Sequence, residues 1–192
     1  MYNCLACYIK HHVIGLTILQ LNEVSMQIYK ANIFDYLGTS TKVCITTNGS
    51  VNKDKHAVLG RGNALQATMC IKQLRQHIGI DNLEKGTVVH YYPNWGLFAF
   101  PVKHEWHQRA NLGLIRSSCK QLISYIKKYD ITKVLLPFPG VGNGKRDPSD
   151  VMPILNQEFK GYEEVIYIVI RSDMKRELMP DNFSNDGGDA SI

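Results

Sequence analysis

The stretch that decides the fold is V-C-I-T-T-N-G-S at residues 43–50, followed by L-G-R-G-N-A at residues 59–64. A β-branched run comes first, a polar loop with Asn and Gly follows, and Gly-Arg-Gly opens a segment with apolar residues at helical spacing. Glycines let the backbone approach an anion, and a helix start offers free N–H groups and a favourable dipole. Strand, loop and helix start therefore predict a phosphate-binding site.

A second loop of the same kind occurs later in the chain. Residues 133–137 (K-V-L-L-P) are typical of a buried strand, and F-P-G-V-G-N-G at residues 138–144 leads toward a helix near Pro148. Neither loop matches the dinucleotide fingerprint or the P-loop. Two glycine-rich loops after two apolar strands indicate a ligand with two phosphates, bound at the carboxyl ends of a sheet.

The remaining patterns alternate between strand and helix. Strands are expected at residues 27–31, 43–47, 87–92, 96–102, 133–136 and 164–170, a short helical turn at 33–37, and helices at 62–77, 112–126 and 148–159. This order predicts an α/β fold, a three-layer α/β/α sandwich with a mixed, mostly parallel central sheet. We expect one domain at 26–171, an N-terminal extension at 1–25 and a polar C-terminal tail at 172–192.

Composition narrows the class of protein. The chain has 192 residues, of which 44% are hydrophobic and 20% charged, as in a globular domain. Its net charge of +5 suits an anionic ligand, without a concentrated basic block that would demand nucleic acid. The apolar run at 13–19 is too short to span a bilayer, so no membrane partner is expected.

Five cysteines are an odd number in a chain of this size, and we interpret them as reduced thiols of a cytoplasmic protein. Cys4-x-x-Cys7 is a lone pair and a poor basis for a zinc or redox site. The sequence therefore implies no metal and no cofactor. Cys44 falls inside a predicted buried strand and is expected to be inert.

Taken together, four motifs resemble the macro domain family, which binds ADP-ribose. They are T-T-N-G-S, G-R-G-x-A, F-P-x-K-x-x-W and P-x-x-G-x-G-N-G, in that order over about residues 26–171. The resemblance is strongest to the branch that holds antitoxin-like DNA ADP-ribosyl glycohydrolases, terminal ADP-ribose glycohydrolases and many phage proteins. It implies ADP-ribose, or ADP-ribosylated DNA or protein, as the partner of a monomer.

The resemblance also assigns site residues by position. Asn32 stands where the family has an Asp that accepts from the adenine amino group, and Asn48 matches an Asn beside the distal ribose. Ile45 replaces a frequent Asn, and Gly144 replaces an Asp of the terminal glycohydrolases, which favours the antitoxin-like members. The complete implied ligand-binding set is Asn32, Ile33, Asn48, Gly60, Arg61, Gly62, Gly140, Val141, Gly142, Asn143 and Gly144.

The resemblance makes Lys103 catalytic. Lys103 follows a strand that ends in Pro101, so it should emerge at the edge of the sheet rather than in the core. There an ammonium stabilises developing negative charge, and a free amine attacks an opened ribose aldehyde. The alternative from the residues alone is a solvated surface lysine.

Other polar residues near these motifs have structural alternatives. Zinc would need further ligands at matching spacing, so we assign His104 and His107 structural or rim positions. We expect Trp106 to pack under its loop and Asp147 to cap a helix, with acid–base work by Asp147 and Asp150 as the alternative for the carboxylates. For Arg61, phosphate contact and surface capping both stay open.

The sequence therefore predicts an ADP-ribose-binding macro domain that hydrolyses an ADP-ribosyl link on DNA or protein. One alternative is a phosphatase that acts on ADP-ribose 1″-phosphate, and another is a module that reads ADP-ribose without cleaving it. A different nucleotide-binding α/β domain is disfavoured because the standard fingerprints are missing.

Overall fold

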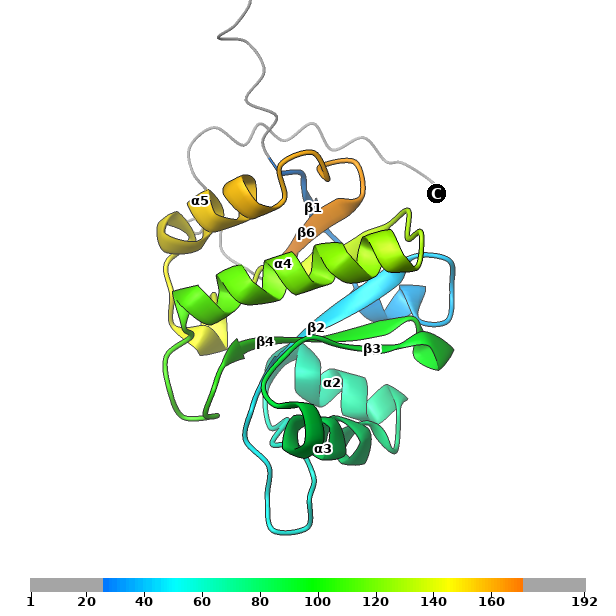
Figure 1. Ribbon diagram of the computed structural model, residues 1–192, viewed down its shortest axis with the longest axis vertical. Helices are drawn as coiled ribbons and strands as arrows, with labels where there is room; N and C mark the ends of the chain where they lie inside the picture. The colour runs from blue at the N-terminus through cyan, green and yellow to red at the C-terminus, as the bar shows by residue number, and fades with distance from the viewer. Residues whose placement is uncertain (1–25, 171–192) are drawn as a thin grey trace, which may run out of the picture.

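The computed structural model describes residues 26–170 of the chain (Figure 1). The predicted N-terminal extension, the polar tail and the Cys4–Cys7 pair lie outside the described residues. Met26 is already buried, with 2% of its surface exposed, and packs into the core. The first described residue therefore belongs to the folded domain.

A six-stranded sheet forms the centre, in the order β1-β6-β5-β2-β4-β3. Neighbouring strands run parallel, except that β3 and β4 are antiparallel. The predicted mixed, mostly parallel sheet is confirmed. Its strands are β1 (Ile28–Lys30), β2 (Lys42–Asn48), β3 (His90–Tyr92), β4 (Leu97–Lys103), β5 (Val134–Pro137) and β6 (Ile166–Ile170).

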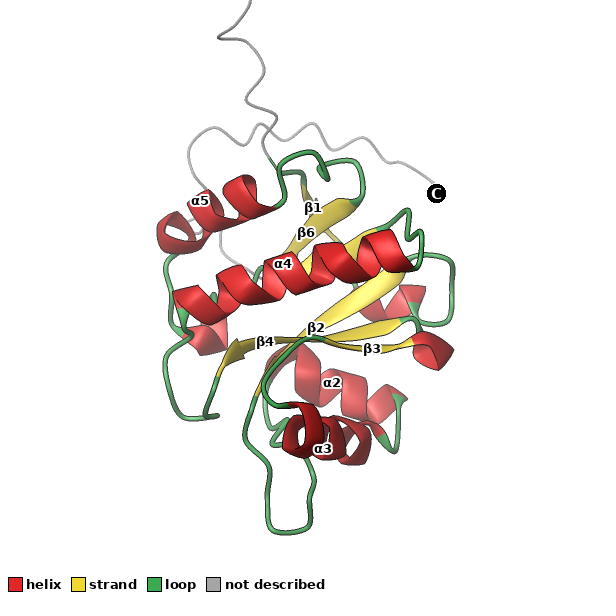
Figure 2. Ribbon diagram, in the orientation of Figure 1, coloured by secondary structure: helices red, strands yellow, loops and turns green. Residues whose placement is uncertain are grey.

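Helices cover both faces of the sheet (Figure 2). On one face lie α4 (Leu112–Lys128) and α5 (Pro148–Glu158), and on the other lie α2 (Gly62–Cys70) and α3 (Leu74–Lys85). Three short 3₁₀ turns complete the described elements: η1 (Ile33–Tyr36), η2 (Pro93–Trp95) and η3 (Gly142–Gly144). The predicted three-layer α/β/α sandwich is confirmed.

Strand β4 shows why the sheet needs two layers of helices. Its side chains alternate, with Phe98 and Phe100 in the core under α4 and α5, and Leu97 and Ala99 in the core under α2 and α3. Successive side chains of a strand point to opposite faces, so an uninterrupted apolar strand must be covered on both sides. The apolar runs of the sequence therefore account for the layers.

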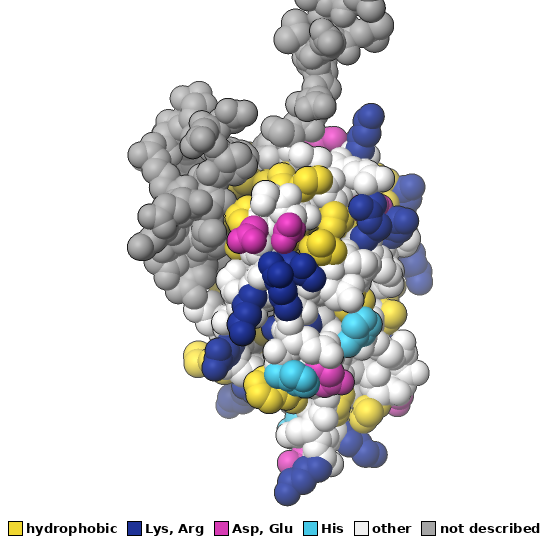
Figure 3. Space-filling model, turned by 90° about the vertical axis from the view of Figure 1, so that its left-hand side faces the viewer, with side chains coloured by type: hydrophobic (Ala, Val, Ile, Leu, Met, Phe, Trp, Pro, Cys, Tyr) yellow, Lys and Arg dark blue, Asp and Glu magenta, His cyan; other side chains and the backbone are white. Residues whose placement is uncertain are grey.

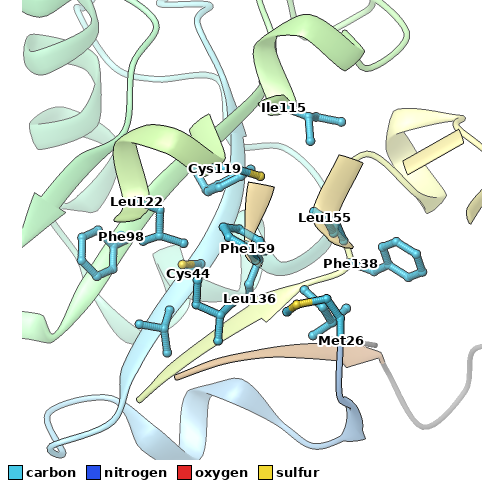
Figure 4. Packing of buried hydrophobic residues seen from close by; sticks show 14 of the residues in the cluster. Met26, Cys44, Phe98, Ile115, Cys119, Leu122, Leu136, Phe138, Leu155 and Phe159 are labelled. Atoms are coloured by element: carbon cyan, nitrogen blue, oxygen red, sulfur yellow. The ribbon is translucent and has the colours of Figure 1, made fainter. Parts of the chain in front are cut away.

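Two of the five cysteines, Cys44 and Cys119, lie in the hydrophobic core between the sheet and helices α4 and α5 (Figure 4). Cys44 and Cys119 are buried and free, and burial raises the pKa of both thiols. A thiol that stays protonated is a weak nucleophile. The predicted burial of Cys44 is confirmed, and its surroundings are those of an inert side chain.

The predicted helix over residues 62–77 is wrong, because the segment forms two helices. Helix α2 ends at Cys70, Ile71 is extended (φ −127°, ψ 99°), and α3 begins at Leu74. The buried side chains continue through the break at helical spacing, so periodicity does not reveal it. After the break, α3 lies directly on the loop at Lys55, since a Cβ on Gly79 would be 2.0 Å from the Lys55 carbonyl oxygen.

The strand expected at 87–92 is shorter than predicted. Only His90–Tyr92 pairs with β4 within this segment, in antiparallel register from His90 opposite Ala99 to Tyr92 opposite Leu97. The N–H of Val89 instead donates to the side-chain oxygen of Gln121 on α4 (2.7 Å). A tertiary contact therefore ends the ladder where the β-branched sequence would continue it.

His90 on β3 is a buried titratable group, 4% exposed. Its Nε2 is buried and has no hydrogen-bond partner. Among the described residues, no other buried side-chain nitrogen or oxygen lacks a partner. Burial lowers the pKa of His90, against the opposing effect of the Asp81 carboxylate, and Lys85 acts in the same direction as burial. The folded protein therefore favours a neutral imidazole.

We expect the free energy of unfolding to fall as the pH drops below about 6.5, because the unfolded state then binds more protons than the folded state. Glutamine does not titrate, so the free energy of unfolding of His90→Gln should not change with pH near 6.5. The loss of stability below about pH 4, where carboxylates such as Asp81 become protonated, should remain. Urea denaturation at about pH 7, 6 and 5 measures both proteins. Equal losses of stability in the two proteins over this range would exclude His90 as the cause.

Candidate functional site

The first loop leaves β2 through Asn48, whose side chain organises the loop. Its Nδ2 donates to the Val58 carbonyl (2.8 Å), and its Oδ1 accepts from the Ser50 N–H (2.9 Å). The backbone oxygen of Asn48 accepts from Asn82 on α3 (3.1 Å). The structure thus places the predicted ribose-side residue at the carboxyl end of β2, where it holds the loop in shape.

Gly60, Arg61 and Gly62 carry the chain from this loop into α2. Gly62 is the first residue of α2 and has φ +61°, a conformation that favours glycine. Arg61 occupies the N-cap position without a side-chain cap hydrogen bond. Local sequence patterns did not single out Asn63, whose Oδ1 accepts from the N–H (3.0 Å) and hydroxyl (3.2 Å) of Thr46. Asn63 therefore fixes the start of α2 against β2.

The second loop follows β5 and turns through η3. Gly140 and Gly142 have φ values of +76° and +71°, and Val141 at the N-cap position of η3 has no side-chain cap hydrogen bond. A Cβ on Gly142 would meet nothing within 4 Å, whereas one on Gly144 would lie 3.0 Å from the Ala110 Cβ. Gly142 therefore faces open space, and Gly144 fits under the neighbouring loop.

The two loops meet at one edge of the sheet. Strands β2 and β5 are parallel neighbours, so their carboxyl ends lie side by side. A Cβ on Gly62 would be 3.1 Å from Nδ2 of Asn143, which places the start of α2 against η3. Two segments about 80 positions apart in the sequence thus form one continuous, glycine-lined backbone surface.

Lys103 is the last residue of β4 and lies where the loops meet. Its Nζ donates to the backbone oxygens of Asn143 (3.1 Å), Gln108 (3.1 Å) and Trp106 (3.3 Å). The predicted position at the end of a strand is confirmed. Because its three acceptors are carbonyls, the ammonium is oriented without a neutralising carboxylate.

The pKa of Lys103 lies below its ordinary value. Partial burial is the largest cause, and the positive charges of Lys145 and Arg61 lower it further. Figure 3 shows Lys and Arg side chains in the middle of one face of the molecule, with acidic side chains directly above them and His side chains below. The site is therefore electropositive.

The loop after Lys103 is braced by a buried serine. Ser50, 7% exposed, donates from its hydroxyl to the Glu105 carboxylate (2.5 Å) and accepts from the Trp106 N–H (2.9 Å). The Trp106 ring is nevertheless 59% exposed and meets the His107 ring edge-on, with centroids 5.5 Å apart. The prediction that Trp106 packs under the loop is wrong, because the brace fixes its backbone and leaves the ring on the rim.

Two arginines that the sequence did not single out fasten the second loop. Arg109 donates from Nε to the Lys145 carbonyl (2.7 Å), and Arg146 donates from Nε to the Ala110 carbonyl (2.7 Å). Arg109 also pairs with Asp147 (3.9 Å) and Asp150 (3.7 Å). These two carboxylates therefore face an arginine.

Asp147 does take the N-cap position of α5, as its place in the sequence predicts. It makes no side-chain cap hydrogen bond, however, so the predicted capping interaction is wrong. Its carboxylate lies 3.9 Å from the Arg109 guanidinium instead. A partner 38 positions away in the chain is not visible in the local sequence pattern.

Asn32 and Ile33 lie at the same edge of the sheet, just after β1. Asn32 caps η1, with its Oδ1 accepting from the Phe34 N–H (3.4 Å) and its Nδ2 donating to the Asp35 carboxylate (2.7 Å). The Ile33 side chain is buried, which leaves its backbone for a ligand. Asp35 was not identified from the sequence. Its carboxylate lies next to Asn32, which stands where the family has an Asp.

Residues 26–170 contain no group of three His, Cys, Asp or Glu side chains that could hold a metal ion. Within the same range, no helix has both the length and the apolar character needed to cross a membrane.

The chain was compared with known proteins. No protein-family model matches it, and none of the curated proteins matches it. Among solved structures, it is similar to the macrodomain of Mycobacterium tuberculosis DarG, with 24% identity and a TM-score of 0.61 over 77% of this chain and 99% of that one. The macrodomain of Thermus aquaticus DarG gives 21% identity and a TM-score of 0.60 over 76% and 97%.

A third similar structure is Thermosipho africanus DarTG in complex with ADP-ribose, with 15% identity and a TM-score of 0.64. The alignment covers 83% of this chain and 44% of that one, so this chain matches less than half of the DarTG protein. The macro domain resemblance stated from the sequence is confirmed for the fold: this chain has the macrodomain fold.

Proposed function

We propose that this protein binds ADP-ribose and hydrolyses an ADP-ribosyl link on a macromolecule. The observation that carries the proposal is the position of Lys103, whose Nζ lies 3.1 Å from the Asn143 carbonyl where two glycine-rich loops meet. A similar fold is known in complex with ADP-ribose. A basic group among exposed backbone N–H groups is suited to an anionic ligand with a reacting centre beside it.

The order of the strands suggests how an elongated ligand lies. Asn32, Ile33 and Asp35 follow β1, the diphosphate loops follow β2 and β5, and Lys103 ends β4. Four strand spacings separate β1 from β4, which is about 19 Å. We therefore place adenine near Asn32, the diphosphate across the two loops, and the distal ribose near Asn48 and Lys103.

The chemistry proposed for Lys103 follows from its surroundings. Its pKa is lowered by burial and by neighbouring cations, so a larger fraction of the amine is neutral than in a solvated lysine. A neutral amine is a nucleophile, and the protonated form stabilises charge that develops on the leaving oxygen or nitrogen. In both roles, Lys103 acts on the bond between the distal ribose and the group to which ADP-ribose is attached, and that bond is the one cleaved.

Trp106 favours a nucleobase over a protein carboxylate as the leaving group. The ring lies on the rim three residues after Lys103, exposed but attached to a backbone that Ser50 and Lys103 hold in place. A rigid, exposed indole is suited to stacking on a base. We therefore propose ADP-ribosylated DNA as the preferred macromolecular substrate.

Trp106→Ala should raise KM for an ADP-ribosylated single-stranded oligonucleotide about tenfold, because one base–aromatic stack is lost. The Kd of free ADP-ribose should stay the same, since the ring lies outside the diphosphate loops. Tyr129→Ala is the matched control, because Tyr129 is also an exposed aromatic side chain (46%) but lies at the far end of α4. Steady-state kinetics on the oligonucleotide measures all three proteins, and an unchanged KM in Trp106→Ala would rule out the stacking role.

One experiment tests the proposed activity against its alternatives. The full chain is incubated with ADP-ribosylated DNA, ADP-ribosylated protein and ADP-ribose 1″-phosphate, and calorimetry compares free ADP-ribose with AMP. Release of ADP-ribose from DNA supports the proposal, and consumption of the 1″-phosphate alone identifies a phosphatase. Binding without any turnover identifies a reader module. Equal affinity for ADP-ribose and AMP would refute the two-loop ligand site itself.

A further inference from the structure

The position of the Lys103 ammonium depends on the loop that follows it in the chain. Residues 104–108, here called the lysine loop, leave the end of β4. Two of the three acceptors of Lys103 Nζ are carbonyl oxygens of this loop, on Trp106 (3.3 Å) and Gln108 (3.1 Å). The third is on Asn143 in the second glycine-rich loop. A change in the shape of the lysine loop would therefore move the amine.

The lysine loop has no apolar anchor of its own. All five of its residues are exposed, and the nearest buried residues are Val102 before it and Ala110 after it. Within the loop, the Glu105 N–H donates to Gln108 Oε1 (3.2 Å), and the Gln108 N–H donates to the Glu105 carbonyl (3.1 Å). Water competes for exposed hydrogen bonds, so these two contacts alone hold the loop weakly.

The first glycine-rich loop supports the lysine loop from outside, through Ser50. Ser50 is 7% exposed, and its hydroxyl donates to the Glu105 carboxylate (2.5 Å) and accepts from the Trp106 N–H (2.9 Å). Within residues 26–170, Ser50 and Lys103 are the only side chains outside the lysine loop that hydrogen-bond to it. The bond to Glu105 is charge-assisted, and such bonds are stronger than those between neutral groups.

Ser50 is itself fixed by backbone contacts. Its N–H donates to Asn48 Oδ1 (2.9 Å), and its carbonyl accepts from the Val58 N–H (3.0 Å). The preceding residue, Gly49, donates from its N–H to the His104 carbonyl (2.8 Å). A Cβ on Gly49 would lie 2.8 Å from that same oxygen, so the first loop packs directly against the start of the lysine loop. The serine hydroxyl is therefore a fixed point for the lysine loop.

We propose that Ser50 is a positioning residue, which holds the Lys103 amine at the reacting centre through Glu105 and the Trp106 backbone. The inference rests on the proposed function, because it takes Lys103 as the group that acts at the distal ribose. Ser50 takes no part in the chemistry itself. A reacting group held in place acts as if at high local concentration, and a misplacement of about 1 Å can cost about a hundredfold in rate.

Ser50→Ala removes the hydroxyl and keeps both backbone contacts of residue 50. It should lower kcat for release of ADP-ribose from modified DNA on the order of tenfold or more. The Kd of free ADP-ribose should not change, because the loop backbone is kept. Added to Lys103→Ala, the same substitution should lower the remaining rate no further, since the hydroxyl acts through that amine. A purely structural role would lower the rate in both backgrounds.

Two substitutions at Glu105 separate position from charge. Glu105→Gln keeps an oxygen that accepts from Ser50 and should retain most of kcat, whereas Glu105→Ala removes the acceptor and should lower kcat as Ser50→Ala does. Equal losses in Gln and Ala would overturn the positioning role, because the carboxylate charge would then be what matters. Glu105 is exposed, so both variants should fold even if Ser50→Ala does not.

Ser118→Ala is the matched control for the loss of a buried hydroxyl. Ser118 is fully buried and donates to the Pro101 carbonyl (2.8 Å), on the same strand as Lys103 but on its core side. Ser118→Ala and Ser50→Ala should both lower Tm, because each leaves a buried group without its hydrogen bond. Only Ser50→Ala should lower kcat, and an equal loss of kcat in the control would reduce the effect to stability.

The reactivity of the Lys103 amine gives a readout that does not depend on catalysis. Competitive acetylation of the full chain with acetic anhydride between about pH 7 and 11, with mass spectrometry of the peptide that contains Lys103, measures the pKa of this amine. In the wild type this pKa should lie below about 10.4, because burial and the charges of Lys145 and Arg61 lower it. In Ser50→Ala the released amine enters water, so its pKa should rise toward that value.

The two measurements distinguish failure of this inference from failure of the proposed function. In an active protein, an unchanged kcat in Ser50→Ala would overturn the positioning role and leave the proposed function intact. If the wild-type protein releases no ADP-ribose from any substrate, the proposed function fails, and acetylation still decides the role of Ser50. A raised pKa of Lys103 in Ser50→Ala would then support positioning, and an unchanged pKa would overturn it.

Discussion

Replacement of Lys103 by Ala should lower the rate of ADP-ribose release from modified DNA on the order of a hundredfold or more. The affinity for free ADP-ribose should change little, because it depends mainly on the adenine contacts and the two glycine-rich loops. The side chain lies at the end of β4 with its Nζ oriented by three carbonyls, so its loss leaves the reacting centre without a positioned amine. Single-turnover kinetics and calorimetry on the same preparation measure the two effects.

Lys103→Arg separates the two chemical roles. A guanidinium keeps the positive charge but is always protonated, so it is not a nucleophile. If Lys103 acts by electrostatic stabilisation, Arg should restore part of the activity. If it acts by covalent attack, Arg should be as inactive as Ala. Wild-type rates in Lys103→Ala would remove Lys103 from the mechanism.

Gly142→Glu should abolish ADP-ribose binding, with an increase in Kd on the order of a hundredfold or more, while the domain still folds. Gly142 has φ +71°, and a Cβ there would meet nothing within 4 Å, so the new side chain would extend into open space rather than into the core. That space is where we place the diphosphate. A carboxylate in it both fills the volume and repels the phosphates.

Gly161→Glu is the matched control for Gly142→Glu. Gly161 also has a positive φ (+84°) with no heavy atom within 4 Å of an added Cβ, but it lies in the turn before β6, at the opposite edge of the sheet. Both variants should lose similar stability from left-handed strain, and only Gly142→Glu should lose binding. Calorimetry and thermal unfolding distinguish them. A folded Gly142→Glu protein with normal affinity would show that this loop does not hold the phosphates.

The elements that local patterns predicted well are those whose burial follows one simple period. Helix α4 buries Ile115, Cys119, Leu122 and Ile126 at spacings of three and four, and the spacing alone locates it. The apolar strands could be recognised because parallel strands covered on both faces have no polar alternation. The break at Ile71 escaped prediction, because the buried core positions keep their helical spacing through it.

The site shows the same division. The positions of the glycine loops and of Lys103 at the ends of strands followed from the sequence, because glycine and strand ends have local signatures. The Ser50 brace on the Trp106 backbone, the ion pair of Asp147 with Arg109, and the contact of Asn63 with Thr46 did not. Each joins residues 17 to 56 positions apart, and a local pattern carries no information about such partners.

What the sequence by itself determined is therefore the six strands, the long helix α4, the layers of the fold and the two loops that end at one edge. These depend on side-chain polarity, period and glycine content, which act within a few residues. The tertiary structure alone decided that the Lys103 ammonium reaches the Asn143 carbonyl, with the positive charges of Lys145 and Arg61 close enough to lower its pKa. Charge interactions depend on distance in space, and that distance exists only once β2, β4 and β5 lie side by side.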